Sequence, residues 1–214
     1  MSGFKDKLID TKQAWAKAGR LLTGTTAAPT QRLPPGQRLV KDWPVLDLGV
    51  QPEITPAAFF LDIGGAVENP QYFKLDDLMA LPQQDSVSDM HCVTAWSRYD
   101  NHWQGVSSRT LLDLVRPLPA AQHVIFHSHD GYTTNVRLDQ FADDDVFLVH
   151  RWEGEAISRV HGGPVRVLIP KLYLWKSAKW VNRIEIATAD HPGFWERNGY
   201  HNNANPWLEE RYSA

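Results

Sequence analysis

Residues 123–138, His123-Val-Ile-Phe-His-Ser-His-Asp-Gly-Tyr-Thr-Thr-Asn-Val-Arg-Leu138, carry the strongest signal of fold class in this chain. Val, Ile, Phe, Tyr and Thr are enriched in β-strands, and Asp-Gly is a favoured turn between two strands. The stretch therefore predicts two strands, His123–Ser128 and Tyr132–Leu138, with a turn at Asp130-Gly131 between them.

The flanking sequence adds more strands than helices. A helix is predicted over 75–81, stopping before Pro82, and another is predicted from a cap at Ser107 or Ser108 to just before Pro117. Further strands are predicted at Ala58–Ile63, Val146–His150, Val165–Ile169 and Lys179–Ala187. Because strands and helices do not alternate regularly, the pattern predicts a β-rich α+β fold and argues against a doubly wound parallel sheet.

The two ends of the chain differ from this central part. Residues 3–20 have helical spacing of Phe4, Leu8 and Trp15, and a Thr, Ala and Pro-rich linker follows them up to residue 35. We expect the unit 1–35 to pack on the surface of a single domain, 36–214. The tail after residue 189 is rich in Asn, Pro, Gly and aromatic residues and is expected to wrap around this domain without regular structure.

Composition excludes several classes of protein. With 43% hydrophobic and 22% charged residues among 214, the chain is typical of a folded globular protein and not of a disordered one. No run of about 18 apolar residues predicts a membrane span. The net charge of −3 gives no overall attraction to nucleic acid. Because the N-terminus lacks an apolar signal core, a cytoplasmic location is predicted.

Cys92, the single cysteine, is the first candidate for chemistry. Its isolation excludes an intrachain disulfide and a zinc site built from several thiolates. Its neighbourhood, Asp89-Met-His-Cys-Val-Thr-Ala-Trp-Ser97, includes polar residues and an imidazole. Two interpretations stay open, a buried structural thiol or a thiolate acting as a nucleophile or soft-metal ligand.

The second candidate is the stretch His161-Gly-Gly-Pro-Val-Arg166, followed by a loop with Lys176, Ser177 and Lys179. The glycines let a ligand approach the backbone closely, and Arg, Lys and hydroxyl groups together favour an anion such as phosphate. The alternative is that Arg166 and Lys179 point to solvent at alternate strand positions.

Other motifs indicate less. His127 and His129 would lie on one face of a strand, as in some metal sites, but no further ligand follows at a suitable spacing, so a partly solvated pair is expected. No phosphate-binding glycine loop, Gly-x-Ser-x-Gly or His-Glu-x-x-His motif occurs. A Cys–His hydrolase using Cys92 remains an alternative without a local signature.

Taken in order along the chain, these segments resemble the molybdopterin-binding domain of the sulfite oxidase-type oxidoreductase family, and most closely its short bacterial stand-alone members. The likeness covers about residues 40–205. The segments that carry it are His91-Cys-Val-Thr-Ala-Trp-Ser97, Asp130-Gly-Tyr-Thr-Thr-Asn135, Asp144-Asp-Val-Phe-Leu148, Gly154-Glu155, His161-Gly-Gly-Pro-Val-Arg166, Lys176-Ser-Ala-Lys-Trp180, Pro192-Gly-Phe-Trp-Glu196 and Gly199-Tyr-His201.

The resemblance implies a β-rich α+β fold, a molybdenum–molybdopterin cofactor and a role for particular residues. Cys92 corresponds to the cysteine whose thiolate binds molybdenum, which makes it the metal ligand and a catalytic residue. The residues expected to contact the cofactor are His91, Cys92, Ser128, His161, Arg166, Ser177, Ala178 and Lys179.

Two differences from sulfite oxidases argue against sulfite as the substrate. Where those enzymes carry basic residues after the cysteine, this chain has Val93-Thr-Ala-Trp-Ser97, with Arg98 only later. Their catalytic tyrosine corresponds here to His150, whose imidazole we expect near the metal as a proton donor or substrate contact. The chain also ends at Ala214, without a haem domain or an immunoglobulin-like dimerisation domain. We therefore expect a monomer that uses a separate redox partner or electron carrier.

The expected activity is a two-electron oxygen-atom transfer on a small substrate, sulfur-containing or another oxo compound, in a direction that the sequence leaves open. The alternatives are a non-catalytic pterin- or anion-binding module, in which Cys92 is a plain thiol, and the Cys–His hydrolase.

Overall fold

The computed structural model describes residues 7, 9–14, 25–26 and 32–213. Residues 7 and 9–14 are helical, as predicted, and are called the N-terminal helix below. The predicted anchors of that helix, Phe4, Leu8 and Trp15, and most of the predicted linker lie outside the described residues.

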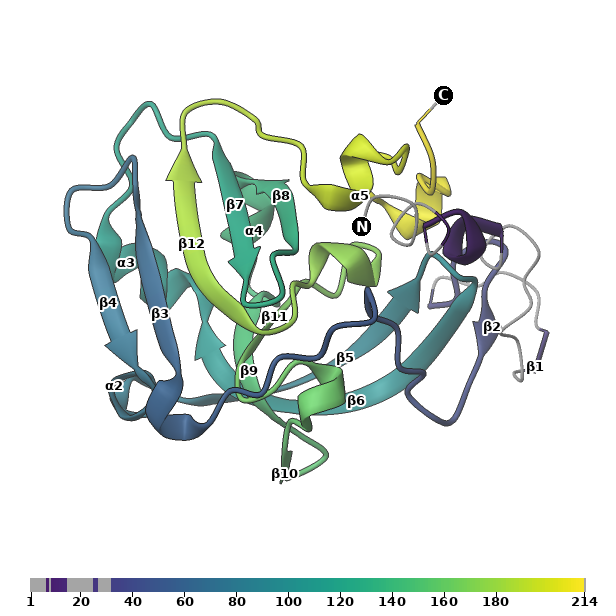
Figure 1. Ribbon diagram of the computed structural model, residues 1–214, viewed down its shortest axis with the longest axis horizontal. Helices are drawn as coiled ribbons and strands as arrows, with labels where there is room; N and C mark the ends of the chain where they lie inside the picture. The colour runs from purple at the N-terminus through teal and green to yellow at the C-terminus, as the bar shows by residue number, and fades with distance from the viewer. Residues whose placement is uncertain (1–6, 8, 15–24, 27–31, 214) are drawn as a thin grey trace.

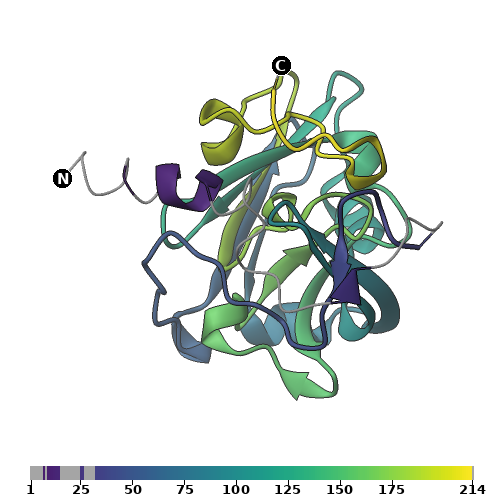
Figure 2. The same ribbon diagram turned by 90° about the vertical axis from the view of Figure 1, so that its right-hand side faces the viewer.

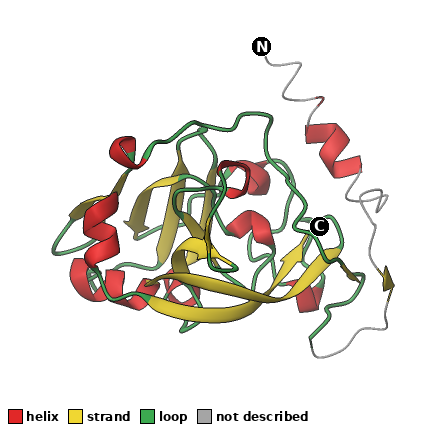
Figure 3. Ribbon diagram, turned by 90° about the horizontal axis from the view of Figure 1, so that it is seen from below, coloured by secondary structure: helices red, strands yellow, loops and turns green. Residues whose placement is uncertain are grey.

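Two β-sheets form the body of the molecule (Figure 1). In the described residues the first sheet has seven strands, and its long β5–β6 ribbon passes beneath the second sheet in the view of Figure 3. The first sheet contains, in spatial order, β1 (Thr25–Thr26), β2 (Arg38–Leu39), β6 (Trp96–Ser107), β9 (Phe147–Trp152) and β10 (Glu155–Ala156), with β5 (Gln84–Cys92) beside β6 and β11 (Arg166–Leu168) beside β9. The second contains, in order, β4 (Gln71–Lys74), β3 (Phe60–Gly65), β12 (Val181–Ala187), β7 (His123–Ser128) and β8 (Thr133–Arg137).

Helices are short and fill the ends and edges of the sheets. They are α2 (Leu75–Ala80), α3 (Ser108–Val115), α4 (Leu138–Phe141) and α5 (Phe194–Arg197), with the 3₁₀ turns η1 (Pro56–Ala58), η2 (Arg159–His161), η3 (Leu174–Lys176) and η4 (Pro206–Leu208). The β-rich α+β prediction is therefore confirmed. Within the described residues, no helix combines the length and apolar character that crossing a membrane would require.

The predicted elements form for the reasons that the sequence indicates. β7 begins and ends at the predicted residues, and Val124 and Phe126 are fully buried in the core. Gly131 takes the positive φ of the predicted turn, +82°. Ser107 caps α3, because its Oγ accepts a hydrogen bond from the Arg109 N–H (3.2 Å).

The long hairpin of β5 and β6 is the largest element that the sequence analysis missed. The first half of β5, Gln84-Asp-Ser-Val-Ser-Asp89, offers a single apolar side chain, and Val87 is 57% exposed. Residues 84–89 therefore lack the alternation of apolar and polar side chains that predicts a strand. Pairing with β6 supplies the stability instead, including a hydrogen bond from Trp103 Nε1 to Ser88 Oγ (3.0 Å).

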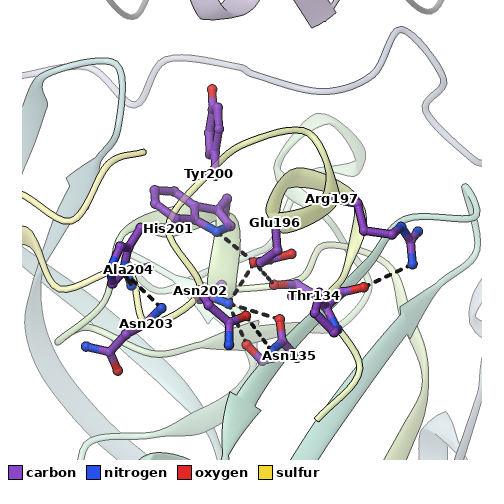
Figure 4. A network of polar contacts seen from close by, with 12 residues as sticks. Thr134, Asn135, Glu196, Arg197, Tyr200, His201, Asn202, Asn203 and Ala204 are labelled. Carbon is purple, nitrogen blue, oxygen red and sulfur yellow. Dashed lines mark hydrogen bonds and ion pairs between the residues drawn. The ribbon is translucent and has the colours of Figure 1, made fainter. Parts of the chain in front are cut away.

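A buried ion pair between Lys176 and Glu196 attaches the C-terminal tail to the body. Figure 4 shows Glu196 in its polar network with Thr134. Lys176 Nζ lies 2.7 Å from Glu196 Oε1, and the two side chains are 0% and 2% exposed. Thr134 Oγ1 and Trp175 Nε1 also donate to that carboxylate, each at 2.9 Å, and Lys176 donates to the Asn135 carbonyl (2.8 Å). The pair therefore joins α5 to β8 and to the loop that continues into residues 177–180.

We expect Glu196→Gln to lower the free energy of unfolding by about 3 kcal/mol, because it leaves the Lys176 charge buried without a counterion. The matched control is Lys171→Ala, which removes an exposed pair with Asp143 and should cost less than about 1 kcal/mol. Urea unfolding of both variants measures the difference, and equal losses would contradict this role of the buried pair.

Candidate active site

One cavity brings together five of the predicted site residues, Cys92, His161, Arg166, Ser177 and Lys179. It measures about 960 Å³, open solvent at its mouth included. Its walls come from the N-terminal helix, the segment 43–48, the β5–β6 turn, the turn after β7, the stretches 161–166 and 174–180, and the tail. Residues distant in the sequence therefore meet here, as expected of a ligand site.

Cys92 lies at the last position of β5, and its side chain lines the cavity. Thr94 Oγ1 donates a hydrogen bond to its Sγ (3.1 Å). Burial raises the pKa of the Cys92 thiol above its ordinary value, while the Thr94 hydrogen bond and the Arg211 charge oppose this rise. Arg211 also donates to the Val93 carbonyl (2.7 Å) and so fixes the turn that presents the sulfur.

Arg166 is the buried cation of the cavity wall. Its Nη1 donates to the His161 carbonyl and its Nη2 to the Ser177 carbonyl, both at 2.8 Å. Burial lowers the pKa of Arg166 to about 9, and no carboxylate of the described residues contributes to that value. The guanidinium thus binds two loops together and keeps a positive charge that no neighbouring acid neutralises.

Lys179 and Ser177 line the cavity beside Arg166. Lys179 Nζ donates to the Val160 carbonyl (3.0 Å) and lies 4.2 Å from the centroid of the Trp180 ring. Burial, followed by the charge of Arg166, lowers the pKa of Lys179 to about 7. Ser177 Oγ accepts a hydrogen bond from the Ile169 N–H (2.9 Å), which leaves its own proton available for a ligand.

His161 closes the other side of this cationic group. Its ring stacks on Trp43 with centroids 4.0 Å apart and planes 7° from parallel. Burial, then the charges of Arg166 and Lys179, lowers the pKa of His161 to about 4. The imidazole is therefore neutral near pH 7 and offers a hydrogen bond instead of a charge.

Gly162 allows the two halves of the site to approach. It has a φ of +103°, and a Cβ at this position would lie 2.8 Å from the Lys179 Cβ. A larger residue at position 162 would force Lys179 away from the cavity. The group that approaches the backbone of Gly162 closely is therefore the Lys179 side chain, whereas the sequence predicts a ligand there.

Four of the predicted contacts lie outside the cavity lining. His91 precedes Cys92 in β5, and it lies outside the lining because successive side chains of a strand point to opposite faces. Its Nδ1 lies 2.8 Å from Ser97 Oγ. Ser128 is buried at the end of β7, where its Oγ has no hydrogen-bond partner among the described residues. Ala178 is buried, and its carbonyl accepts from the Val167 N–H (2.9 Å).

The fourth is His150, on β9. Its Nε2 lies 2.9 Å from Gln83 Oε1, and Gln83 in turn donates to carbonyls at the C-terminal end of α2. One ring nitrogen of His150 is therefore paired with Gln83, and His150 does not line the cavity.

Lys176 and Lys179 belong to one loop but serve different purposes. The sequence predicts an anion site that includes both lysines, whereas Lys176 is paired with Glu196 inside the protein and is absent from the cavity lining. His127 and His129 are both partly exposed, as predicted. His127 Nε2 lies 3.2 Å from Glu185 Oε2, and the His129 ring is T-shaped against Phe60.

Sequence reasoning missed several residues of the cavity. Trp43 packs on His161, and the centroid of its ring lies 5.2 Å from Arg166 Cζ. Other lining residues that were not predicted are Lys12, Asp47 and Tyr200. They come from irregular segments or from the N-terminal helix, whose periodicity does not say what they face. Trp43 is itself part of the buried hydrophobic core, so its residue type gives no separate sign of a role in the cavity.

The residues present fit a cofactor that brings its own metal ligands and an anionic group. No group of three or more His, Cys, Asp or Glu side chains in the described part of the chain could hold a metal ion alone. Cys92 offers one soft ligand, and the uncompensated charge of Arg166 suits an anion. Trp96, also on the cavity wall, has an indole N–H with no hydrogen-bond partner among the described residues.

Comparison with known proteins agrees with this fit. The chain is 40% identical over 183 residues to the uncharacterized oxidoreductase YuiH of Bacillus subtilis (strain 168), which covers 85% of this chain and 92% of YuiH. It is 27% identical to the protein-methionine-sulfoxide reductase catalytic subunit MsrP of Ralstonia nicotianae, over 73% of this chain and 53% of MsrP.

The sulfane dehydrogenase SoxCD of Paracoccus pantotrophus has a similar fold, with a TM-score of 0.62 and 20% identity. The similarity covers 73% of this chain and 46% of the SoxCD chain, so this chain spans about half the length of MsrP and of SoxCD. The family model of the oxidoreductase molybdopterin-binding domain matches residues 48–195. The chain therefore belongs to this family of sulfite oxidase type, and it is an oxidoreductase that binds molybdenum–molybdopterin.

Proposed function

We propose that this protein catalyses a two-electron oxygen-atom transfer on a small, sulfur-containing substrate and exchanges electrons with a separate carrier. The observation that carries the proposal is that one cavity holds both the Cys92 sulfur and the cations Arg166 and Lys179. A soft metal ligand and an anion-binding group are the two things that a molybdenum–molybdopterin site requires of the protein.

When bound, the cofactor supplies a metal centre that takes up or gives two electrons together with an oxygen atom. In the proposal, Cys92 is the protein ligand of the metal. Arg166, Lys179 and the Ser177 hydroxyl bind the anionic group, and the neutral His161 donates a hydrogen bond to the pterin from its position on Trp43. The chain therefore positions the cofactor through two separate contacts.

The substrate region favours an uncharged compound. In the β5–β6 turn beside Cys92, the cavity is lined by the uncharged residues Val93, Thr94 and Trp96. Arg98, the first basic residue after the cysteine, is absent from the lining and contacts Glu153 instead, at 3.1 Å. A neutral sulfoxide or thioether suits this wall better than sulfite does. The name of MsrP, the catalytic subunit of a protein-methionine-sulfoxide reductase, supports a sulfur–oxygen substrate.

The geometry does not favour the Cys–His hydrolase. A catalytic thiol of that kind needs a depressed pKa and an adjacent imidazole. Burial instead raises the pKa of the Cys92 thiol, and its Sγ accepts a hydrogen bond from the Thr94 hydroxyl and not from an imidazole. A part in the reaction is not assigned to His150, because its ring is bonded to Gln83. Direct cofactor contacts of His91, Ser128 and Ala178, the cytoplasmic location and the monomeric state stay predictions.

Cys92→Ser should abolish turnover and leave the cofactor bound, because the cationic contacts are separate from the metal ligand. Lys179→Met should instead lower cofactor occupancy about tenfold, since losing a charged hydrogen bond costs ~1.5–3 kcal/mol. Molybdenum per chain and pterin fluorescence after oxidation measure occupancy, and methionine sulfoxide with a reduced dye provides the turnover assay. Full turnover of the Cys92→Ser protein would overturn the assignment.

Anion binding to the cofactor-free protein should weaken as the pH rises from 6 to 8, an interval in which Arg166, with a pKa of about 9, keeps most of its charge. With a pKa of about 7, Lys179 loses its proton in this interval, and the neutral amine no longer attracts an anion. Sulfate is a suitable probe because it does not titrate here, and calorimetry measures its affinity. We expect Lys179→Met to bind weakly with little pH dependence, and the exposed Lys171→Met to behave as the wild type. The same pH dependence in Lys179→Met would contradict this role.

A further inference from the structure

The N-terminal helix is attached to the body on the side where the cavity opens. Ile9 packs against the hydrophobic core, and Gln13 Nε2 donates to the carbonyl of Asn198 in the loop after α5 (2.6 Å). Figure 2 shows this helix between the tail that carries α5 and the segment that precedes η1. Residues 9, 12 and 13 share one face of a helix, so Lys12 lies on the attached face.

Lys12 lines the cavity together with Asp47, whereas Lys7 on the same helix is exposed. Burial lowers the pKa of Lys12, and the charges of Asp47 and Cys92 act in the opposite direction. The charge of Lys12 in turn lowers the pKa of Lys179. Lys12 therefore lies within electrostatic reach of both the Cys92 sulfur and the cationic turn.

The charges on the cavity wall do not balance. Lys12, Arg166 and, at a pH below its pKa of about 7, Lys179 are cationic, against the two carboxylates Asp47 and Asp130. The Asp47 carboxylate already accepts hydrogen bonds from Gly49 N (2.8 Å) and Gln51 Nε2 (2.7 Å). An excess of cations in a half-buried cavity favours a ligand with more than one negative charge.

We propose that Lys12 is a third cationic contact of the bound cofactor and that the N-terminal helix covers and retains it. This inference rests on the proposed function, because it takes the cavity to be the cofactor site. The chemistry that Lys12 recognises is an anionic oxygen, which either the cofactor phosphate or an anionic substrate could supply. The position of Lys12 beside the Arg166 and Lys179 group favours the cofactor.

The test compares full-length, cofactor-loaded Lys12→Ala with Lys7→Ala, which removes a lysine from the exposed face of the same helix. Molybdenum and pterin are measured per chain at intervals during dialysis. We expect Lys12→Ala to release the cofactor about tenfold faster than the wild type, Lys7→Ala to release it at the wild-type rate, and Lys12→Arg to restore retention. Equal thermal unfolding of the cofactor-free proteins excludes a general loss of stability.

The outcomes separate this inference from the proposed function. If the wild type and Lys12→Ala retain the cofactor equally well, Lys12 does not contact it, and the proposed function is unaffected. A wild type without cofactor overturns the proposed function itself. Normal retention combined with weaker sulfate inhibition of Lys12→Ala would assign Lys12 to a substrate anion and contradict the cofactor contact. Faster release from Lys12→Gln as well as from Lys12→Ala would confirm that the charge is responsible.

Discussion

The site depends on one buried cation, the guanidinium of Arg166. Its two hydrogen bonds to the carbonyls of His161 and Ser177 hold together the loops on either side of β11. Because burying a charge is costly, such a group persists only where hydrogen bonds and a counter-charge compensate it. The protein provides the hydrogen bonds, and the ligand is left to provide the charge. Loop geometry and anion affinity thus have a common origin.

Two lysines three residues apart show how the fold divides this task. Lys176 points into the protein and is neutralised by Glu196 of the tail, whereas Lys179 lines the cavity and donates to the Val160 carbonyl instead of to a carboxylate. The first lysine is structural and fixes the course of the loop; the second is available to a ligand. The C-terminal tail therefore contributes to binding without supplying a cation of its own to the anion site.

Much of the second sheet and the chemistry of the cavity could be predicted from the sequence, because both depend on residues that are close together in the chain. The apolar run of β7 and the glycines beside His161 are examples. The hairpin of β5 and β6 could not be predicted, because the first half of β5 is polar and is stabilised by pairing with β6 and not by an apolar face of its own. Trp43 and Lys12 were missed for a related reason, since their segments acquire a function only by packing against distant loops.

The central claim is that the sulfur of Cys92 is a metal ligand in a cavity whose cations hold the cofactor independently. X-ray absorption at the molybdenum edge tests it most directly, on the loaded wild type and on Cys92→Ser at equal molybdenum content. The account predicts that the variant loses one sulfur neighbour and gains a lighter scatterer. An unchanged sulfur shell would contradict it.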